Sequence, residues 1–298
     1  MRKHLLAALL IASLPTALCA EPAPESASPA APAKADVASI IAKLTPQRGS
    51  IDIDHGLATL DLPSDLGYLP PDQTYILYRD VLHYPVQQQT LGALVPLNVP
   101  IGSPASWSAA LTYQRDGNVT DADAPKLDPA VLLAYMKNEE MDYTAKLKQQ
   151  GLSKLSVELV GWVKPPHYDT EKHTLEWGLE IVPPAGQHVI NYNFRLLGRH
   201  GMLGISTVTP MEQLPAIEGA STKIAAALKF NPTYGYTDFM ADTDKKAPYG
   251  LVSIVTGHAA AVKAQHTATT LGQWMLASAM IAAAAFIFKG VRRKKAES

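Results

Sequence analysis

One uncharged apolar stretch near the C-terminus restricts how this chain of 298 residues can be arranged relative to a membrane. Residues 271–288 read LGQWMLASAMIAAAAFIF. As a helix this stretch would rise about 27 Å, close to the thickness of the hydrocarbon core of a bilayer. Basic side chains crowd residues 289–298, which favours a cytoplasmic tail by the positive-inside rule. We therefore predict a transmembrane helix over 271–288, and the alternative is a buried core helix.

The N-terminus has the features of a secretory signal peptide. Two basic residues precede an apolar run over residues 5–14, and the small residue Ala20 suits a cleavage site. Cleavage there also removes Cys19, the single cysteine of the chain. The alternative, lipidation of Cys19, is disfavoured because Leu18 stands where that signal needs a small residue.

Together the two ends predict a bacterial inner-membrane protein that crosses the membrane once. Its main body lies in the periplasm, its C-terminus lies in the cytoplasm, and its membrane partner is the bilayer around residues 271–288. A division of the body into two lobes near residue 150 stays open. The predicted segments are a signal peptide (1–20), a Pro/Ala-rich linker (21–36), an exported domain (37–262), a juxtamembrane segment (263–270), the membrane helix (271–288) and the basic tail (289–298).

The net charge of −1 averages over unlike compartments. The signal contributes +2 and the tail +4, which leaves −7 for residues 21–288. An acidic body argues against nucleic acid as a partner, because nucleic-acid binders carry a basic surplus. We expect no cofactor.

Apolar periodicity predicts an α+β fold for the exported domain. Four successive runs alternate with a period of two and have short connections, which predicts an antiparallel β meander with covering helices. These runs cover residues 155–159, 175–181, 189–197 and 202–208. Further strands are predicted at 91–97 and 106–114, a hairpin at 51–62, and helices near 37–44, 71–82, 211–228 and 251–262.

The clearest helix signal starts at Asp128, a good N-cap, followed by Pro129, a good first helical residue. Gly151 is a natural stop near Gln150. The apolar side chains expected to share one face of this helix are Leu132, Tyr135, Met136 and Tyr143.

Motifs for phosphate binding, nucleophilic serine chemistry and H-E-x-x-H zinc binding do not occur in the sequence. Two weak metal alternatives remain beside ordinary loop roles for the same residues. A first set of ligands would be His167, Asp169 and His173. A calcium site would use the oxygen atoms of Asp116, Asn118, Asp121 and Asp123.

Several short motifs cluster between residues 155 and 250. The sequence GWVKPPHYD covers 161–169, and NYNFRLLGRHG covers 191–201. With Tyr236 to Phe239 and Tyr249-Gly250, they resemble a bacterial family of predicted membrane-anchored proteins of unknown function. The resemblance covers roughly residues 55–258. It implies an envelope location and assigns no catalytic residue.

The motif residues define a candidate ligand site. We expect Trp162 and Trp177 to stack across adjacent strands, and arginine beside them to bind a carboxylate or phosphate. The alternative is an internal network that fixes the meander, with Asp238 as the partner of an arginine. The candidate residues are Trp162, Asp169, Trp177, Asn191, Arg195 and Arg199.

Two functions follow from these observations. The first is a non-enzymatic protein of the envelope that contacts another envelope protein or serves as a scaffold. The alternative is a periplasmic hydrolase, or a protein that binds a small anionic ligand, with a site near Trp162, Asp169, Asn191 and Arg195. Because the sequence carries no catalytic signature, we favour the first.

Overall fold

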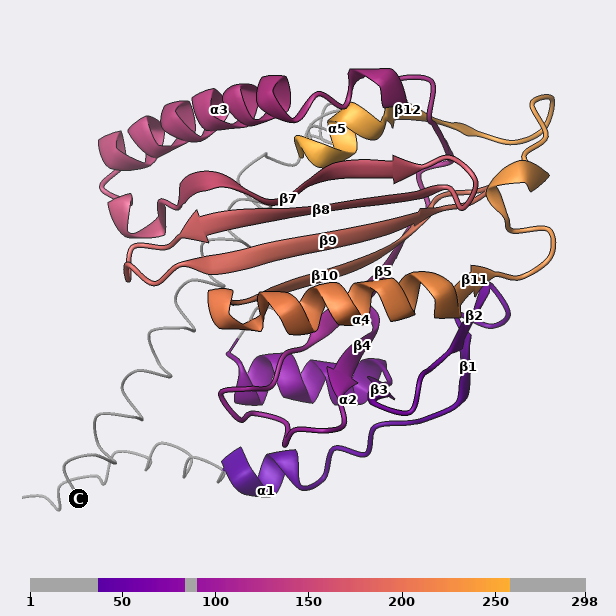
Figure 1. Cartoon of the computed structure of the whole chain (residues 1–298), viewed down its shortest axis with the longest axis horizontal. Coiled ribbons are helices and arrows are strands. Elements are labelled where there is room, and N and C mark those ends of the chain that lie inside the picture. Colours follow the sequence, from indigo (N-terminus) through magenta and orange to yellow (C-terminus); the bar gives the residue numbers. More distant parts are fainter. Residues whose placement is uncertain (1–36, 84–89, 258–298) are drawn as a thin grey trace, which may run out of the picture. The chain divides into compact units, whose positions relative to one another are not determined.

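The structure is a computed structural model that describes residues 37–83 and 90–257 (Figure 1). It is a mixed α+β fold with antiparallel sheets and several helices, as predicted. None of the helices in these two ranges is long and apolar enough to cross a bilayer. The predicted segments 1–20, 21–36, 263–270, 271–288 and 289–298 lie outside the described residues.

A seven-stranded sheet with the order β3-β4-β5-β10-β9-β8-β7 forms the centre of the fold. Its last four strands are the predicted meander, in which each strand pairs antiparallel with the next. These strands are β7 (Glu158–Asp169), β8 (Thr174–Val182), β9 (Val189–Leu197) and β10 (Met202–Pro210). The prediction of a meander is therefore confirmed, but its first run, predicted at residues 155–159, overlaps β7 only at 158–159, because residues 153–155 form a 3-10 turn.

The meander continues into strands from the first half of the chain. Strand β10 pairs with β5 (Ala109–Gln114), and β4 (Thr90–Pro96) and β3 (Leu66–Leu69) complete the sheet. Strand β3 was not predicted, because all four of its residues are buried and its sequence therefore shows no alternation.

Two smaller sheets join segments that are far apart in the sequence. The predicted hairpin, β1 (Ser50–Ile53) and β2 (Ala58–Asp61), gains β11 (Leu228–Phe230) as a third strand. Strand β6 (Asn118–Thr120) pairs in parallel with β12 (Lys246–Gly250). Neither β6 nor β12 was predicted, because such short strands carry too few residues for a pattern.

The helices fall close to their predicted positions. Helix α2 continues directly into the π-helix η1, whereas the rest of the predicted segment 251–262 extends beyond the described residues. The helices are α1 (Val37–Ile41), α2 (Pro71–Ile76), η1 (Leu77–Val81), α3 (Pro129–Gln149), α4 (Leu214–Ala227) and α5 (Leu251–Val255). Short 3-10 turns are η2 (Ala124–Lys126), η3 (Ser153–Leu155), η4 (Met211–Gln213) and η5 (Tyr236–Asp238).

Helix α3 begins and ends as its sequence predicts. The Asp128 carboxylate accepts the N–H groups of Ala130 and Val131 at 2.9 and 3.1 Å. The expected position of Tyr135 on the packed face is wrong, since this side chain is 38% exposed. The buried positions are Leu132 and Leu147, because α3 lies along the edge strand β7 and covers it with a narrow stripe.

The two faces of the central sheet are covered by different elements. Helix α4 and the β1-β2-β11 sheet pack on one face, where Ile217 and Ile224 contact strand residues such as Ile190 and Phe194. Helices α3 and α5 cover the β7–β9 part of the opposite face (Figure 1). A smaller cluster joins α2 to Leu69 and Val95 of β3 and β4.

Replacing Gly117 with alanine tests the contact between β6 and β12. Gly117 has φ +106°, and a Cβ atom there would lie 2.5 Å from the carbonyl oxygen of Lys245. We expect Gly117→Ala to lower the free energy of unfolding by about 2–4 kcal/mol in denaturant titrations. Gly161→Ala is the matched control, with no atom within 4 Å of its new Cβ and an expected change within about 0.5 kcal/mol. Equal effects of the two variants would contradict the account.

Candidate functional site

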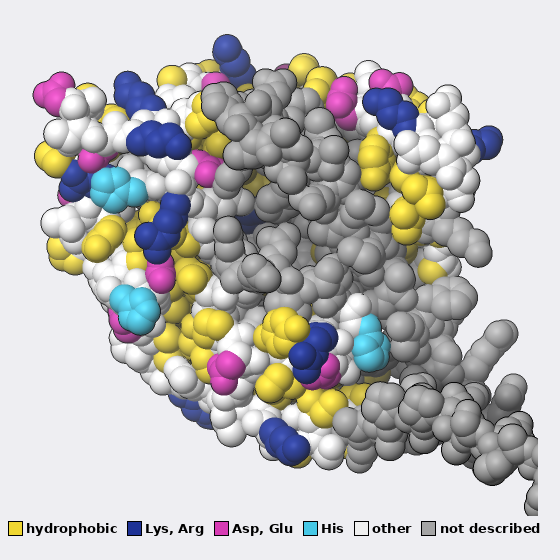
Figure 2. All heavy atoms as spheres, turned by 180° about the vertical axis from the view of Figure 1, so that it is seen from behind, with side chains coloured by type: hydrophobic (Ala, Val, Ile, Leu, Met, Phe, Trp, Pro, Cys, Tyr) yellow, Lys and Arg dark blue, Asp and Glu magenta, His cyan; other side chains and the backbone are white. Residues whose placement is uncertain are grey.

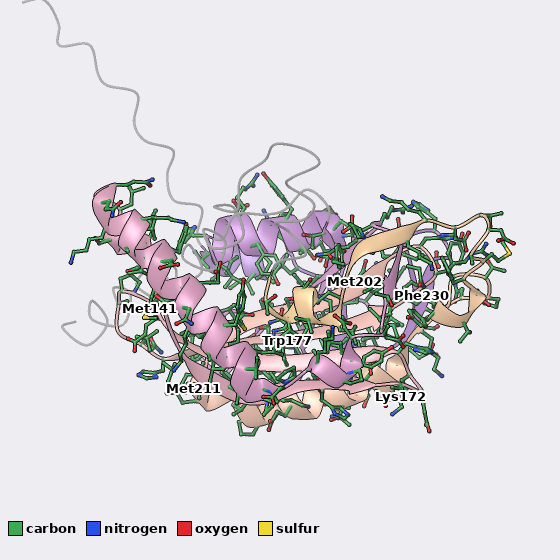
Figure 3. All side chains as sticks on the ribbon, turned by 90° about the horizontal axis from the view of Figure 1, so that it is seen from above. Met141, Lys172, Trp177, Met202, Met211 and Phe230 are labelled. Atoms are coloured by element: carbon green, nitrogen blue, oxygen red, sulfur yellow. The ribbon has the colours of Figure 1, made fainter. Side chains whose placement is uncertain are left out.

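A strip of polar side chains runs across the central sheet on the face opposite α4. Register sets it, because Asn193 pairs with Trp177 on β8 and with Ser206 on β10. Asn191 and Arg195 share this face, since they alternate with Asn193 along β9. We call Trp177, Asn191, Asn193, Arg195 and Ser206 the polar strip. Seen from above, Trp177 lies over the middle of the sheet near α5 (Figure 3).

Arg195 is held at the centre of the polar strip by neutral acceptors. Its Nη1 donates to the carbonyl oxygen of Phe194 at 2.8 Å and to Ser206 Oγ at 3.1 Å. Its Nη2 donates to Asn193 Oδ1 at 3.3 Å. The guanidinium carbon lies 5.1 Å from the Trp177 ring centroid, within cation–π range.

Arg195 forms no ion pair with any carboxylate of the described residues. Surrounding protein removes water from the guanidinium, and this burial lowers the pKa of Arg195 to about 10. The nearby hydroxyl of Tyr249 has a smaller, opposite effect. An arginine with a depressed pKa is a cation without a compensating charge, which costs folding free energy.

Arg199, the second candidate arginine, is paired inside the body. Its Nε and Nη2 donate to the two carboxylate oxygens of Asp244 at 2.7 and 3.1 Å. These hydrogen bonds lower the pKa of Asp244 to about 2. The expected partner, Asp238, instead accepts the N–H of Gly235 at 2.9 Å and caps the turn η5. Asp238, the last residue of η5, is therefore used within its own turn, and Arg199 pairs with Asp244, which comes later in the chain.

Asp169 and Trp162 also have structural partners. The Asp169 carboxylate accepts the N–H groups of Glu171 and Lys172, each at 2.9 Å, and so shapes the β7–β8 turn. Trp162 donates its indole N–H to the carbonyl oxygen of Pro129 at 2.9 Å, which ties β7 to the start of α3. The predicted group of six therefore separates: Trp177, Asn191 and Arg195 come together, and the other three serve turns and packing.

His173, in the β7–β8 turn, joins a different cluster from the one predicted. Tyr168 OH lies 3.0 Å from Asp121 Oδ2 and 3.1 Å from His173 Nδ1. The His173 ring packs on Tyr236 with centroids 4.2 Å apart. Over residues 37–83 and 90–257, no three His, Cys, Asp or Glu side chains are arranged to hold a metal ion. The alternative site with His167, Asp169 and His173 is therefore not formed there.

The acidic residues considered for calcium have separate structural roles. Asp123 accepts the N–H groups of Leu251 and Val252 at 2.9 and 3.1 Å and thus caps α5. Asp116 accepts the hydroxyl of Tyr249 at 2.6 Å. The Asn118 amide donates to the carbonyl oxygen of Gly198 at 3.2 Å, and Asp121 contacts Tyr168.

A second polar group, missed by the sequence analysis, lies on the opposite face beneath α4. Glu176 receives Lys164 Nζ and Tyr192 OH, each at 2.5 Å, and also the hydroxyl of Ser221. Burial acts to raise the pKa of Glu176, but these hydrogen bonds outweigh it and leave the pKa lowered. Successive residues of a strand point to opposite faces of the sheet, so the alternation along β8 could have placed Glu176 on the face opposite Trp177.

A small cavity next to Glu176 does not contain the predicted site. Its lining is almost entirely apolar, with Trp107, Phe194, Ile217 and Ile224 among its walls and Ser221 at its edge. None of the six predicted residues lines it.

The Arg199–Asp244 pair predicts an acid-dependent part of stability. Because the pKa of Asp244 falls from 3.8 to about 2 in the fold, its contribution is complete above pH 3.8. It is lost as the pH falls toward 2. In denaturant titrations, Asp244→Asn should be less stable than wild type at pH 7, and the difference should shrink near pH 2. Asp242→Asn, an exposed neighbour, is the control and should show no such trend. A gap that stays constant with pH would contradict the pairing.

Comparisons with known proteins place the chain in a family but assign no activity. No curated protein matches it. Two solved structures are similar at low scores. Cyanobacterial PsbP (CyanoP) from Synechocystis sp. PCC 6803 has 6% identity and a TM-score of 0.32, covering 62% of this chain and 94% of that one. LpqN, involved in cell envelope biogenesis of Mycobacterium tuberculosis, has 16% identity and a TM-score of 0.30, covering 65% and 96%.

The family match covers most of the sequence. A model described as a protein of unknown function (DUF2167) matches residues 45–287, which include most of the described residues. The chain therefore belongs to the DUF2167 family of proteins of unknown function.

Proposed function

We propose that this protein is a non-enzymatic, inner-membrane-anchored component of a bacterial envelope, whose exported body contacts another envelope protein. The sequence supports the anchor through the signal at residues 1–20, the apolar stretch 271–288 and the basic tail 289–298. After cleavage of the signal, the Pro/Ala-rich segment 21–36 precedes the exported domain of residues 37–262.

The observation that carries the non-enzymatic role is how the candidate polar residues are used. Within the body, Arg199 forms an ion pair with a carboxylate. Asp169 accepts backbone N–H groups in a turn, and Asp123 accepts those at the start of a helix. Catalysis needs polar groups that converge on a space where a substrate can sit. The separation of the six predicted residues therefore favours an interaction role over the hydrolase alternative.

The surface of the body also suits contacts with a protein. Several large apolar side chains are exposed on α3 and the loops, including Val131 at 63%, Met141 at 58% and Met240 at 50%. On the face seen in Figure 2, Lys and Arg side chains are interspersed with Asp and Glu. A mixed surface of this kind supports protein contacts better than binding to a polyanion.

An experiment in intact cells with two arms tests this proposal. In the first arm, a reporter that fluoresces only in the cytoplasm is fused after Ser298, or after Val262 in a chain that ends there. We expect fluorescence from the first fusion and none from the second, because only the first returns its C-terminus to the cytoplasm. The opposite pattern would contradict the membrane arrangement.

In the second arm, a photo-crosslinking residue is placed at Val131, Met240 or Glu218, which are exposed positions on α3, a loop and α4. At least one position should give a discrete adduct with an envelope protein in the full chain. The adduct should weaken in the chain that ends at Val262, because the anchor raises the local concentration at the membrane. Failure to form an adduct at all three positions would contradict the interaction role.

A further inference from the structure

We propose that Arg195 and the polar strip form a binding site for a small monocarboxylate, independent of the partner contact proposed above. The starting point is the unused edge of the guanidinium. Its Nε–H donates to no described residue, and its Nη2 has only the 3.3 Å contact with Asn193 Oδ1. Nε–H and Nη2–H form the edge with which arginine grips a carboxylate in a bidentate manner.

The same molecule shows what this edge does when a carboxylate is present. Arg199 uses Nε and Nη2 to bind both oxygens of Asp244 at 2.7 and 3.1 Å. Arg79 uses the same two atoms on Asp80 at 2.5 and 2.6 Å. Arg195 is the more desolvated cation, yet its edge has no such partner among the described residues. A carboxylate from outside would supply the missing charge.

The site is rigid because its side chains come from paired strands. The Ser206 hydroxyl donates to Asn193 Oδ1 at 2.9 Å, and the Asn193 amide donates to Asn191 Oδ1 at 2.8 Å. Gly204 lets the arginine lie close to β10, since a Cβ atom there would be 3.3 Å from Arg195 Cζ and Nε. A group held in this way needs little reorganisation when a ligand binds.

Access and charge set the class of ligand. As whole residues, Asn191, Arg195 and Ser206 are partly exposed, although the guanidinium itself is desolvated, whereas Ile190 and Ile205 on the opposite face are buried. A single desolvated cation balances a single negative charge, so a monocarboxylate fits better than a dianionic phosphate. Trp177 adds an apolar wall, which favours a carboxylate carried on an aromatic or aliphatic group.

Binding of benzoate to the purified full chain in detergent tests the site. Affinity is measured from tryptophan fluorescence and from the shift in thermal unfolding midpoint. We expect saturable binding of benzoate, and much weaker binding of benzamide and inorganic phosphate at matched ionic strength. A peptide with a free C-terminus and its amidated form identify the carboxylate source. Preference for the free peptide over benzoate assigns a chain end, and preference for benzoate assigns a free metabolite-like acid.

Two substitutions of Arg195 test whether the guanidinium edge binds the carboxylate. Arg195→Gln removes the charge, and Arg195→Lys keeps the charge but loses the fork of donors. Each should weaken benzoate binding at least about tenfold. Arg115→Gln, at an arginine whose side chain is 71% exposed, is the matched control and should bind as wild type does. Near-ultraviolet circular dichroism confirms that each variant is folded.

Three results would overturn the proposal. They are the absence of carboxylate binding by the wild-type chain, unchanged binding in folded Arg195→Gln or Arg195→Lys, and equal or tighter binding of phosphate.

Discussion

The packing of residues 116–123 against residues 244–252 is the contact on which the rest of the structure depends. It joins segments 128 positions apart, where Asp123 caps α5 through the N–H of Leu251. Parallel pairing of β6 with β12 and the Asp116–Tyr249 hydrogen bond complete it. Because this contact holds α5 over the sheet, it also covers Trp177 and the buried half of the meander. Asp116 and Asp123, which the sequence analysis considered as calcium ligands, therefore hold these two segments of the fold together.

The same logic explains why most polar motif residues carry no chemistry. The β7–β8 and β9–β10 turns of the antiparallel meander lie at the same end of the sheet, and each brings a charged side chain that must find a partner. Arg199 finds Asp244, Asp169 finds backbone N–H groups in its own turn, and Asn118 finds the carbonyl oxygen of Gly198. Arg195 stands apart, because its partners among the described residues are neutral groups and an aromatic ring. A desolvated cation lowers the stability of the fold, and a protein retains such a residue when its charge serves a function such as ligand binding.

Sequence reasoning succeeded where the signal was local and repeated. Alternation over residues 175–181, 189–197 and 202–208 predicted β8, β9 and β10, and Asp128 with Pro129 predicted the start of α3. It failed where pairing between distant segments creates the element, as in β6 and β12, and where burial on both faces hides the period, as in β3. Within the candidate site, strand period brought Trp177, Asn191 and Arg195 together. It could not choose Asp244 over Asp238 for Arg199, because that choice depends on how the loop after β11 folds back.

The central claim is that Arg195 binds a ligand, whereas Arg199 stabilises the fold. Equilibrium unfolding of Arg195→Met and Arg199→Met at pH 7, without added carboxylate, tests it most directly. We predict that Arg195→Met is as stable as wild type or more stable, because it removes a desolvated cation that no described carboxylate balances. Arg199→Met should be clearly less stable, because it leaves Asp244 without its partner. If Arg195→Met is destabilised as much as Arg199→Met, both arginines are structural and the account is wrong.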